Sequence, residues 1–271
     1  GSNITGAGTL VVSGATVHAN GLLGIAATGT SINVSSGTLN LNNDTTVATP
    51  LTLSGGTLAG SGNVTVTGPF NVTATSTLSG TGTFTTQGTS TLDMTGAGSF
   101  LALTGGKTWI NQGTATLGGD DLIYFGYSSG GANALTNAAG ATFNLTTTNA
   151  NPLSLWTGTA IFDNAGTFNN AAAATHTLSS GIAFNNTGTV NVTAGTLTVS
   201  SSFSQTGTIS LATATTLLDA SGFTNAGIIQ GSGIVNVGAG NLVNAGTLRP
   251  GGTNGAGQLV IAGNLVNAAS G

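Results

Sequence analysis

The sequence predicts an all-β fold, a right-handed parallel β-helix (β-solenoid) that runs through residues 1–271 as a single elongated domain. Three observations predict it: few helix-forming residues, short stretches in which apolar and polar residues alternate, and a phrase that recurs about every 20 residues. Glu is absent and Lys and Arg together number two, whereas Gly numbers 46. Gly, Ser, Asn and Thr form helices poorly, and alternating Val, Ile, Phe and Thr favour strands.

The recurring phrase is a large apolar residue, any residue, Asn or Gln, any residue and then Gly. In the second half of the chain its first residues are separated by 22, 19, 20, 19 and 23 positions. A period of this length is typical of solenoids, in which stacked coils bury an apolar face that a single coil cannot bury. The phrase begins at Phe162, Phe184, Phe203, Phe223, Leu242 and Leu265, and more widely spaced members begin at Trp109 and Leu135.

Each coil is expected to consist of three short strands joined by tight turns. Val190 and Val192 alternate with polar residues, and Leu197 and Val199 do the same after a Gly. Parallel pairing of equivalent strands at a spacing of ~4.8 Å would stack the apolar positions into columns. With about 20 residues per coil, the chain predicts roughly 13 coils and a rod about 60–65 Å long.

The Asn or Gln of the phrase is expected to form a ladder in which each side-chain amide bonds to the amide one coil away. Each bond contributes only about 0.5–1.5 kcal/mol, so the ladder would set the register of the coils more than their stability. The Gly that follows fits a turn position with φ > 0. The predicted ladder residues are Asn164, Asn186, Gln205, Asn225, Asn244 and Asn267.

Charge and cysteine content exclude several classes of protein. The net charge is −4, and two cationic side chains cannot neutralise a phosphate backbone, so we expect no nucleic-acid partner. No apolar run approaches the ~18 residues of a spanning helix, so we expect no membrane insertion. The absence of Cys rules out disulfides and thiolate chemistry.

The chain offers little for catalysis, and we expect no enzymatic activity, no cofactor and no metal site. His18 and His176 are the two imidazoles, and each lies in an alternating stretch in which we expect it to face outward. Neither has a carboxylate within ten residues, whereas a Ser–His–Asp arrangement needs a carboxylate that orients the base. A zinc site would need three or four ligands, and the sequence has no His pair and no Cys.

Two other functions of solenoids are less favoured. Polysaccharide-acting β-helix enzymes use clustered acidic and basic residues, and this chain has no Glu and one Lys. Thr-x-Thr pairs such as Thr65/Thr67 and Thr114/Thr116 raise the hypothesis of ice binding. These pairs do not recur at one coil, so we attribute them to composition.

The segment 118–131 breaks the repeat and is expected to be an irregular insertion. It holds the one acidic pair and both Tyr residues of the chain, and the two Trp residues lie before and after it. Aromatic rings beside carboxylates are typical of a sugar- or cation-binding patch. The alternative is a loop whose aromatic rings cover the apolar end of a coil. The candidate ligand-binding residues are Trp109, Asp120, Asp121, Tyr124, Tyr127 and Trp156.

Residues 245–265, AGTLRPGGTNGAGQLVIAGNL, resemble the passenger-associated repeat of bacterial autotransporters. That repeat has a Gly-x-Leu-x-Pro-Gly phrase, a loop of small residues and a strand that ends near Gly-Asn. The rest of the chain is similar in style to the Asn/Gly/Thr-rich passengers of autotransporters and filamentous-haemagglutinin-type adhesins. The resemblance implies a right-handed parallel β-helix, secretion across an outer membrane, and adhesion or matrix building, and it carries over no catalytic residue.

We therefore expect a secreted or cell-surface bacterial protein that acts as a structural rod or fibre subunit. Because neither end shows a polar cap, coils could stack head to tail with other copies or with neighbouring β-helical segments, building filaments or a surface matrix. The alternative is an adhesin passenger segment that binds a host or glycan receptor through 118–131.

Overall fold

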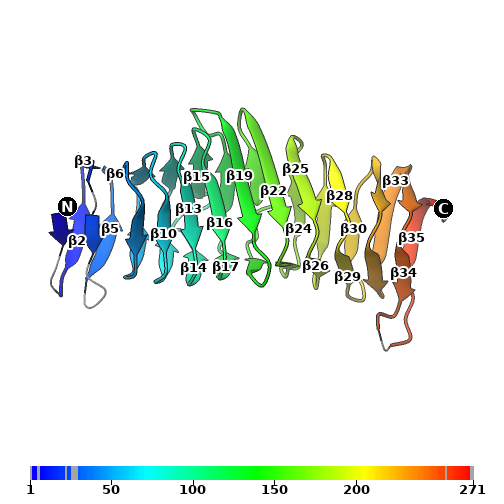
Figure 1. Cartoon of the computed structure of the whole chain (residues 1–271). Helices are drawn as coiled ribbons and strands as arrows, with labels where there is room; N and C mark the ends of the chain where they lie inside the picture. Colours follow the sequence, from blue (N-terminus) through cyan, green and yellow to red (C-terminus); the bar gives the residue numbers. More distant parts are fainter. Residues whose placement is uncertain (1, 5–6, 22, 26–29, 254, 269–271) are drawn as a thin grey trace.

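The computed structural model describes residues 2–4, 7–21, 23–25, 30–253 and 255–268 and shows a parallel β-solenoid in the form of a rod (Figure 1). Its described strands pair only in parallel, and the described ranges contain no helix, hence none long and apolar enough to cross a membrane. The predicted all-β solenoid is confirmed.

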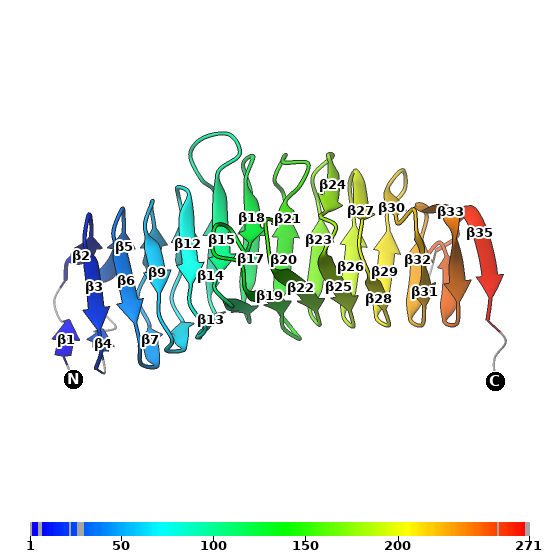
Figure 2. The ribbon, with the colours of Figure 1, turned by 90° about the horizontal axis from the view of Figure 1, so that it is seen from above.

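Each coil contains three strands, and equivalent strands of successive coils stack into three faces, as Figures 1 and 2 show. Face 1 is a 12-stranded sheet of β2 (Thr9–Val12), β5 (Ser31–Val34), β8 (Leu51–Leu53), β11 (Phe70–Val72), β14 (Thr89–Leu92), β17 (Thr114–Leu117), β20 (Thr142–Leu145), β23 (Thr167–Asn170), β26 (Thr189–Val192), β29 (Thr208–Leu211), β32 (Ile228–Gly231) and β34 (Thr247–Pro250). Face 2 consists of β3 (Thr16–Ala19), β6 (Thr38–Leu41), β9 (Thr57–Ala59), β12 (Ser76–Ser79), β15 (Phe100–Thr104), β18 (Leu122–Phe125), β21 (Leu153–Leu155), β24 (Thr175–Leu178), β27 (Thr196–Val199) and β30 (Thr216–Leu218).

Face 3 follows face 2 in each coil. It consists of β7 (Thr45–Val47), β10 (Val64–Val66), β13 (Thr83–Thr86), β16 (Thr108–Asn111), β19 (Ala132–Asn137), β22 (Thr159–Asn164), β25 (Ile182–Asn186), β28 (Phe203–Gln205) and β31 (Gly222–Asn225), and the pair β1 (Ser2–Ile4) and β4 (Leu23–Ile25) precedes it. The long strands β33 (Ile234–Asn244) and β35 (Val260–Asn267) contribute their first halves to face 2 and their second halves to face 3. They join both faces into one 21-stranded sheet.

The solenoid has about 11 turns of roughly 22 residues, so the predicted 13 coils of 20 residues are wrong in detail. The difference arises in the middle of the rod, where 25, 28 and 25 residues separate the paired positions Thr89, Thr114, Thr142 and Thr167. The extra residues lie in longer connections at 93–99, 126–131 and 146–152, and the first of these is the loop that projects beside β15 in Figure 2. Eleven steps of ~4.8 Å give a rod of about 53 Å rather than 60–65 Å.

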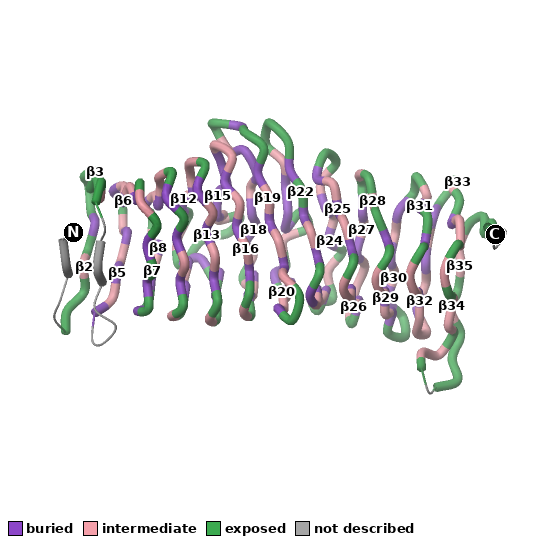
Figure 3. The backbone as a smooth tube through the Cα atoms, in the orientation of Figure 1, coloured by how far each residue is buried: buried purple, intermediate pink, exposed green. Residues whose placement is uncertain are grey.

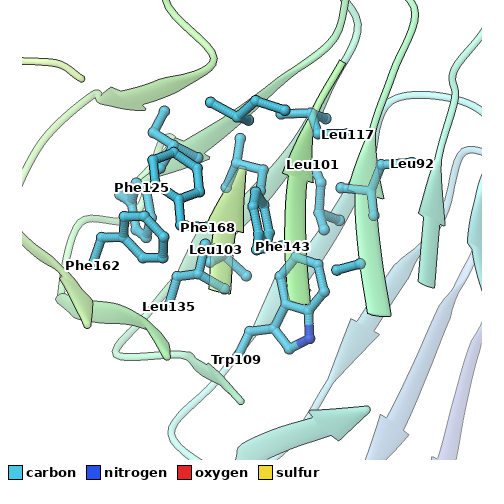
Figure 4. Close-up of a cluster of buried hydrophobic side chains, with 14 of the residues drawn as sticks. Leu92, Leu101, Leu103, Trp109, Leu117, Phe125, Leu135, Phe143, Phe162 and Phe168 are labelled. Atoms are coloured by element: carbon cyan, nitrogen blue, oxygen red, sulfur yellow. The ribbon is translucent and has the colours of Figure 1, made fainter. Parts of the chain in front are cut away.

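Apolar side chains from all three faces fill the interior (Figures 3 and 4). The predicted Phe column is confirmed: the rings of Phe162, Phe184 and Phe203 stack at centroid distances of 5.1 Å with planes 7° and 5° apart. Trp109 belongs to this core, fully buried, and its indole N–H donates to the Thr86 hydroxyl over 3.0 Å. Its predicted place in a surface patch is wrong.

The predicted amide ladder is also confirmed, and it begins earlier, at Asn111. Side-chain amides donate from each coil to the next over 2.7–2.9 Å, from Asn111 to Asn137 and on to Asn164. Gln205 interrupts the ladder, because its amide N–H donates to the carbonyl O of Gly207 instead of to the next coil. The ladder's side-chain bonds are Asn111–Asn137, Asn137–Asn164, Asn164–Asn186, Asn186–Gln205, Asn225–Asn244 and Asn244–Asn267.

The glycines that follow the ladder residues have a different role from the predicted one. Gly188, Gly207 and Gly227 are not among the residues with positive φ. A Cβ on each would instead strike the backbone of the preceding coil; on Gly207, for example, it would strike the carbonyl O of Gly188. Glycine is needed here because the backbones of neighbouring coils approach too closely for any side chain.

Candidate functional site

Four aromatic rings meet on the outer surface of face 2, and we refer to them as the surface aromatic cluster: Phe100, Tyr124, Tyr127 and Trp156. Three of the six predicted ligand-binding residues belong to it. Trp156 is 58 % exposed, the most exposed large apolar side chain among the residues that the structure describes, and the other three rings are half-buried. The cluster therefore presents an accessible indole that packs against Tyr124 and Tyr127, and Phe100 packs against both tyrosines.

Strand alternation and coil stacking bring these residues together. On β18, Ile123 and Phe125 are buried in the core while Tyr124 between them faces outward. Phe100 begins the preceding strand of the face, β15, and Trp156 directly follows the next one, β21. The backbone N–H of Trp156 donates to the carbonyl O of Phe125 over 2.8 Å, which holds residue 156 beside β18.

Tyr127 reaches the cluster because the chain turns sharply after β18. Gly126, with φ of 75°, starts this turn, and a Cβ there would strike the carbonyl O of Thr157. Ser128 also has a positive φ of 59°. The segment 118–131, predicted as an irregular insertion, contains a regular strand, Leu122–Phe125, between a turn at 118–121 and an irregular part at 126–131.

The four rings pack against one another at centroid distances of 4.6–5.8 Å. Tyr124 and Tyr127 stack with planes 29° apart, and both contact Trp156, at 84° and 59°. Contacts of this geometry add about 0.5–1.5 kcal/mol per pair beyond area burial. The neighbouring rings consequently fix the orientation of the exposed indole before any ligand arrives.

The predicted acidic pair does not line this cluster. Asp121 is fully buried; one carboxylate oxygen accepts the N–H of Met94 over 2.6 Å, and the other has no partner among the described residues. Burial raises the pKa of Asp121 to about 6, and the nearby charges of Asp93 and Asp120 raise it further, against the Met94 bond. Asp120 is half-buried at the corner between β17 and β18. Asp121 is therefore a buried residue of the corner, and its prediction as a ligand-binding residue is wrong.

Few other ionisable groups reach solvent near the cluster. Lys107 is buried, with its ammonium donating to the carbonyl O of Gly82 over 2.7 Å, and burial lowers its pKa to about 8. Arg249 lies on β34, far along the rod (Figure 1). No cationic side chain is thus placed to bind an anion at the aromatic cluster.

The two histidines do not share a site. His18 is exposed, as predicted. His176 is fully buried, so its predicted outward position is wrong: its ring nitrogens lie 2.5 Å from the Asn170 amide O and 2.9 Å from the Thr147 carbonyl O. Burial lowers its pKa, with a smaller opposing effect of the Thr147 bond. Across the described ranges, no group of three or more His or acidic residues is arranged to hold a metal ion.

Two features of the surface were not predicted from the sequence. Phe100 completes the cluster, and its place at the start of a face 2 strand could have been read from the apolar run that follows it. A second amide row lies outside face 1, where Asn169 donates to Asn144 over 2.8 Å and Asn191 donates to Asn169 over 2.9 Å. The signal for this row was the recurring Thr-x-Asn at the start of strands.

No protein family, curated protein or solved structure matches this chain. Its class is defined by the fold: a parallel β-solenoid of about 11 turns. On that fold, the surface aromatic cluster is the arrangement best suited to contact another molecule.

Proposed function

We propose that the chain is an extracellular, rod-shaped adhesin-type protein that binds glycans through the surface aromatic cluster. The exposure of Trp156, 58 % in a ring that packs against Tyr124 and Tyr127, carries this proposal. Exposed groups of large apolar side chains mark interaction sites more often than isolated ones do. The resemblance of residues 245–265 to the repeat of autotransporter passengers supports an extracellular, bacterial setting.

Aromatic rings suit glycans because a sugar ring has a face of C–H groups and an edge of hydroxyls. The C–H face packs on an indole or phenol ring, and Tyr hydroxyls bond to the sugar hydroxyls. Trp156 would supply the stacking surface, and the hydroxyls of Tyr124 and Tyr127 would supply the polar contacts. The ligand would lie along the side of the rod, on face 2.

The positions of the charged side chains relative to the cluster favour an uncharged sugar as the ligand. A carboxylated or sulfated sugar binds best where Arg or Lys can pair with it, and here Lys107 is buried and Arg249 is remote. The acidic residues Asp93 and Asp120 near the corner of face 2 would repel an anion further. Neutral glycans are therefore the expected class.

A glycan array probed with the wild-type chain and Trp156→Ala tests this function. We expect the wild type to bind neutral glycans and Trp156→Ala to lose at least roughly tenfold in affinity, which corresponds to about 1.4 kcal/mol. Ile161→Ala, which removes an exposed apolar side chain of face 3, is the matched control and should bind as the wild type does. Equal binding by the wild type and Trp156→Ala, or binding of acidic glycans alone, would contradict the proposal.

A second candidate, the fibre subunit, is favoured by the surface of β35. Val260, Leu265 and Val266 are 37 %, 44 % and 45 % exposed, and β35 pairs on one side with β33. Another coil laid against β35 would cover these side chains and extend the sheet. Negative-stain electron microscopy distinguishes the two: filaments many times longer than one rod support a fibre, and separate rods of about 50 Å support a monomeric binder.

A further inference from the structure

The outer surface of face 1 carries a straight column of threonines, one per coil over six consecutive coils. Each threonine begins its strand and pairs directly with the next, without a bulge or register shift. The column ends where Ile228 takes the position. Its members are Thr89, Thr114, Thr142, Thr167, Thr189 and Thr208, and we refer to them as the threonine column.

The hydroxyls of the threonine column make no hydrogen bond to protein anywhere in the part of the chain that the structure describes. The pattern differs in the row two residues further along each strand, where Asn144, Asn169 and Asn191 bond to one another. Since a hydroxyl needs a partner, the column's hydroxyls bind water. Their methyl groups are held in uniform positions because β-branching restricts χ1.

The regular spacing of the hydroxyls on face 1 would space the bound water molecules regularly too. The hydroxyls repeat at ~4.8 Å along the rod, and the second polar row lies about 6.6 Å away, two residues along each strand. A sheet in constant register therefore presents a two-dimensional lattice of hydrogen-bonding groups and methyls. Water bound to this lattice has the regular spacing of a solid surface rather than that of a normal hydration shell.

The side chains of face 1 favour ordered water over a sugar as the ligand of this face. Strands β14 to β29 of this face carry no charged residue, and their aromatic rings, Phe143 and Phe168, are buried in the core. Without an exposed ring there is no stacking surface for a sugar, in contrast to face 2. We propose that face 1 binds ice, through ordered water held by the threonine column.

The Thr-x-Thr pairs of the sequence do not recur once per coil because they lie on different faces, Thr114/Thr116 on face 1 and Thr65 on face 3. Within face 1 the second position varies among Thr, Asn and Ser, which hides the constant first position. The structure places Thr89-x-Thr91 and Thr114-x-Thr116 directly beside one another, and the first position remains Thr through four further coils.

Uptake into slowly grown ice tests the proposal with the full chain. We expect the wild type to concentrate in the ice several-fold relative to a non-binding protein of equal size, and to inhibit ice recrystallisation. Thr167→Lys, in the middle of the column, should reduce uptake to the level of that protein. Thr136→Lys is the matched control, because Thr136 is also a half-buried, outward residue of a strand, β19, but it lies on face 3 between Ile110 and Asp163 and belongs to no threonine column.

Thermal unfolding followed by circular dichroism must show that both variants remain folded; if Thr167→Lys unfolds, Thr167→Tyr replaces it. Exclusion of the wild type from ice, or equal uptake of the two variants, overturns the proposal. So does Thr167-dependent retention on crystalline cellulose or chitin without uptake into ice. Trp156→Ala should bind ice normally, so the outcome is independent of glycan binding.

Discussion

At the scale of single residues, the alternation of inward and outward side chains along a strand (its parity) decides which residues are buried. His176 lies two residues before Leu178 and so shares the inward side of its strand with a core residue. Trp109 likewise precedes the ladder residue Asn111 by two. Alternation along the strand predicts these two burials from the sequence. It does not predict that of Asp121, which precedes β18 and is followed by two further buried residues, Leu122 and Ile123. The outward assignments failed because they followed side-chain polarity, or proximity to the 118–131 segment, instead of parity.

Replacing Asp121 with Asn tests whether its buried carboxyl is as perturbed as the structure indicates. The pKa is about 6 in the folded chain and 3.8 ordinarily, so between these values the folded state binds more protons than the unfolded state. The carboxyl's contribution to stability therefore falls as pH rises through this window.

The advantage of Asp121→Asn over the wild type should accordingly grow by about 1–3 kcal/mol between pH 4 and pH 7 and then level off. Urea unfolding at pH 4, 5, 6 and 7 measures this difference. A constant difference across that range would show that the carboxyl titrates alike in both states.

At the scale of elements, the inner amide ladder and the glycines beside it define one corner of the rod. The sequence predicted the ladder because its phrase combines a bulky residue, an amide and a Gly at fixed spacing. It did not predict the backbone contact that excludes a Cβ at the Gly, because that contact depends on the distance between coils. Nor did it predict the interruption at Gln205, whose longer side chain reaches its own turn.

Asn164→Ala should destabilise the chain by about 2–4 kcal/mol, because it leaves buried partners on both neighbouring coils without a hydrogen bond. Asn164 accepts from Asn137, and it donates to Asn186 and to the carbonyl O of Thr189. Asn191→Ala in the outer row is the control, and solvent can replace its bonds, so a loss below about 1 kcal/mol is expected. Chemical denaturation compares the two, and equal losses would mean that the inner ladder has no special role.

Gly188→Ala should lower the free energy of unfolding by about 1–3 kcal/mol, because the added methyl strikes the carbonyl O of Gly166 and the two coils must separate. Gly118→Ala is the control, because a Cβ there meets its nearest atoms at an ordinary 3.6 Å. That change should be neutral or stabilising by up to about 1 kcal/mol. Melting temperatures measure both, and a harmless Gly188→Ala would disprove the close-approach explanation.

For the whole molecule, the sequence predicted the architecture but overestimated the number of coils. The period was read from residues 162–267, where coils are short, and the central coils are longer by several residues. Those longer coils carry the surface aromatic cluster, so the departure from the period and the candidate site occur in the same place. A cluster assembled from β15, β18 and the residues after β21 depends on stacking across three coils, and no local motif reveals it.

The central claim, that the exposed indole of the cluster binds glycan, can be measured directly because the chain has two Trp residues, one exposed and one buried. Acrylamide should quench the fluorescence of Trp156 and spare that of Trp109. Adding the neutral glycan that binds best on the array should protect Trp156 from quenching, with saturation at the concentration that saturates binding. Binding that leaves Trp156 fully accessible to acrylamide would contradict the claim and place the glycan site elsewhere on the rod.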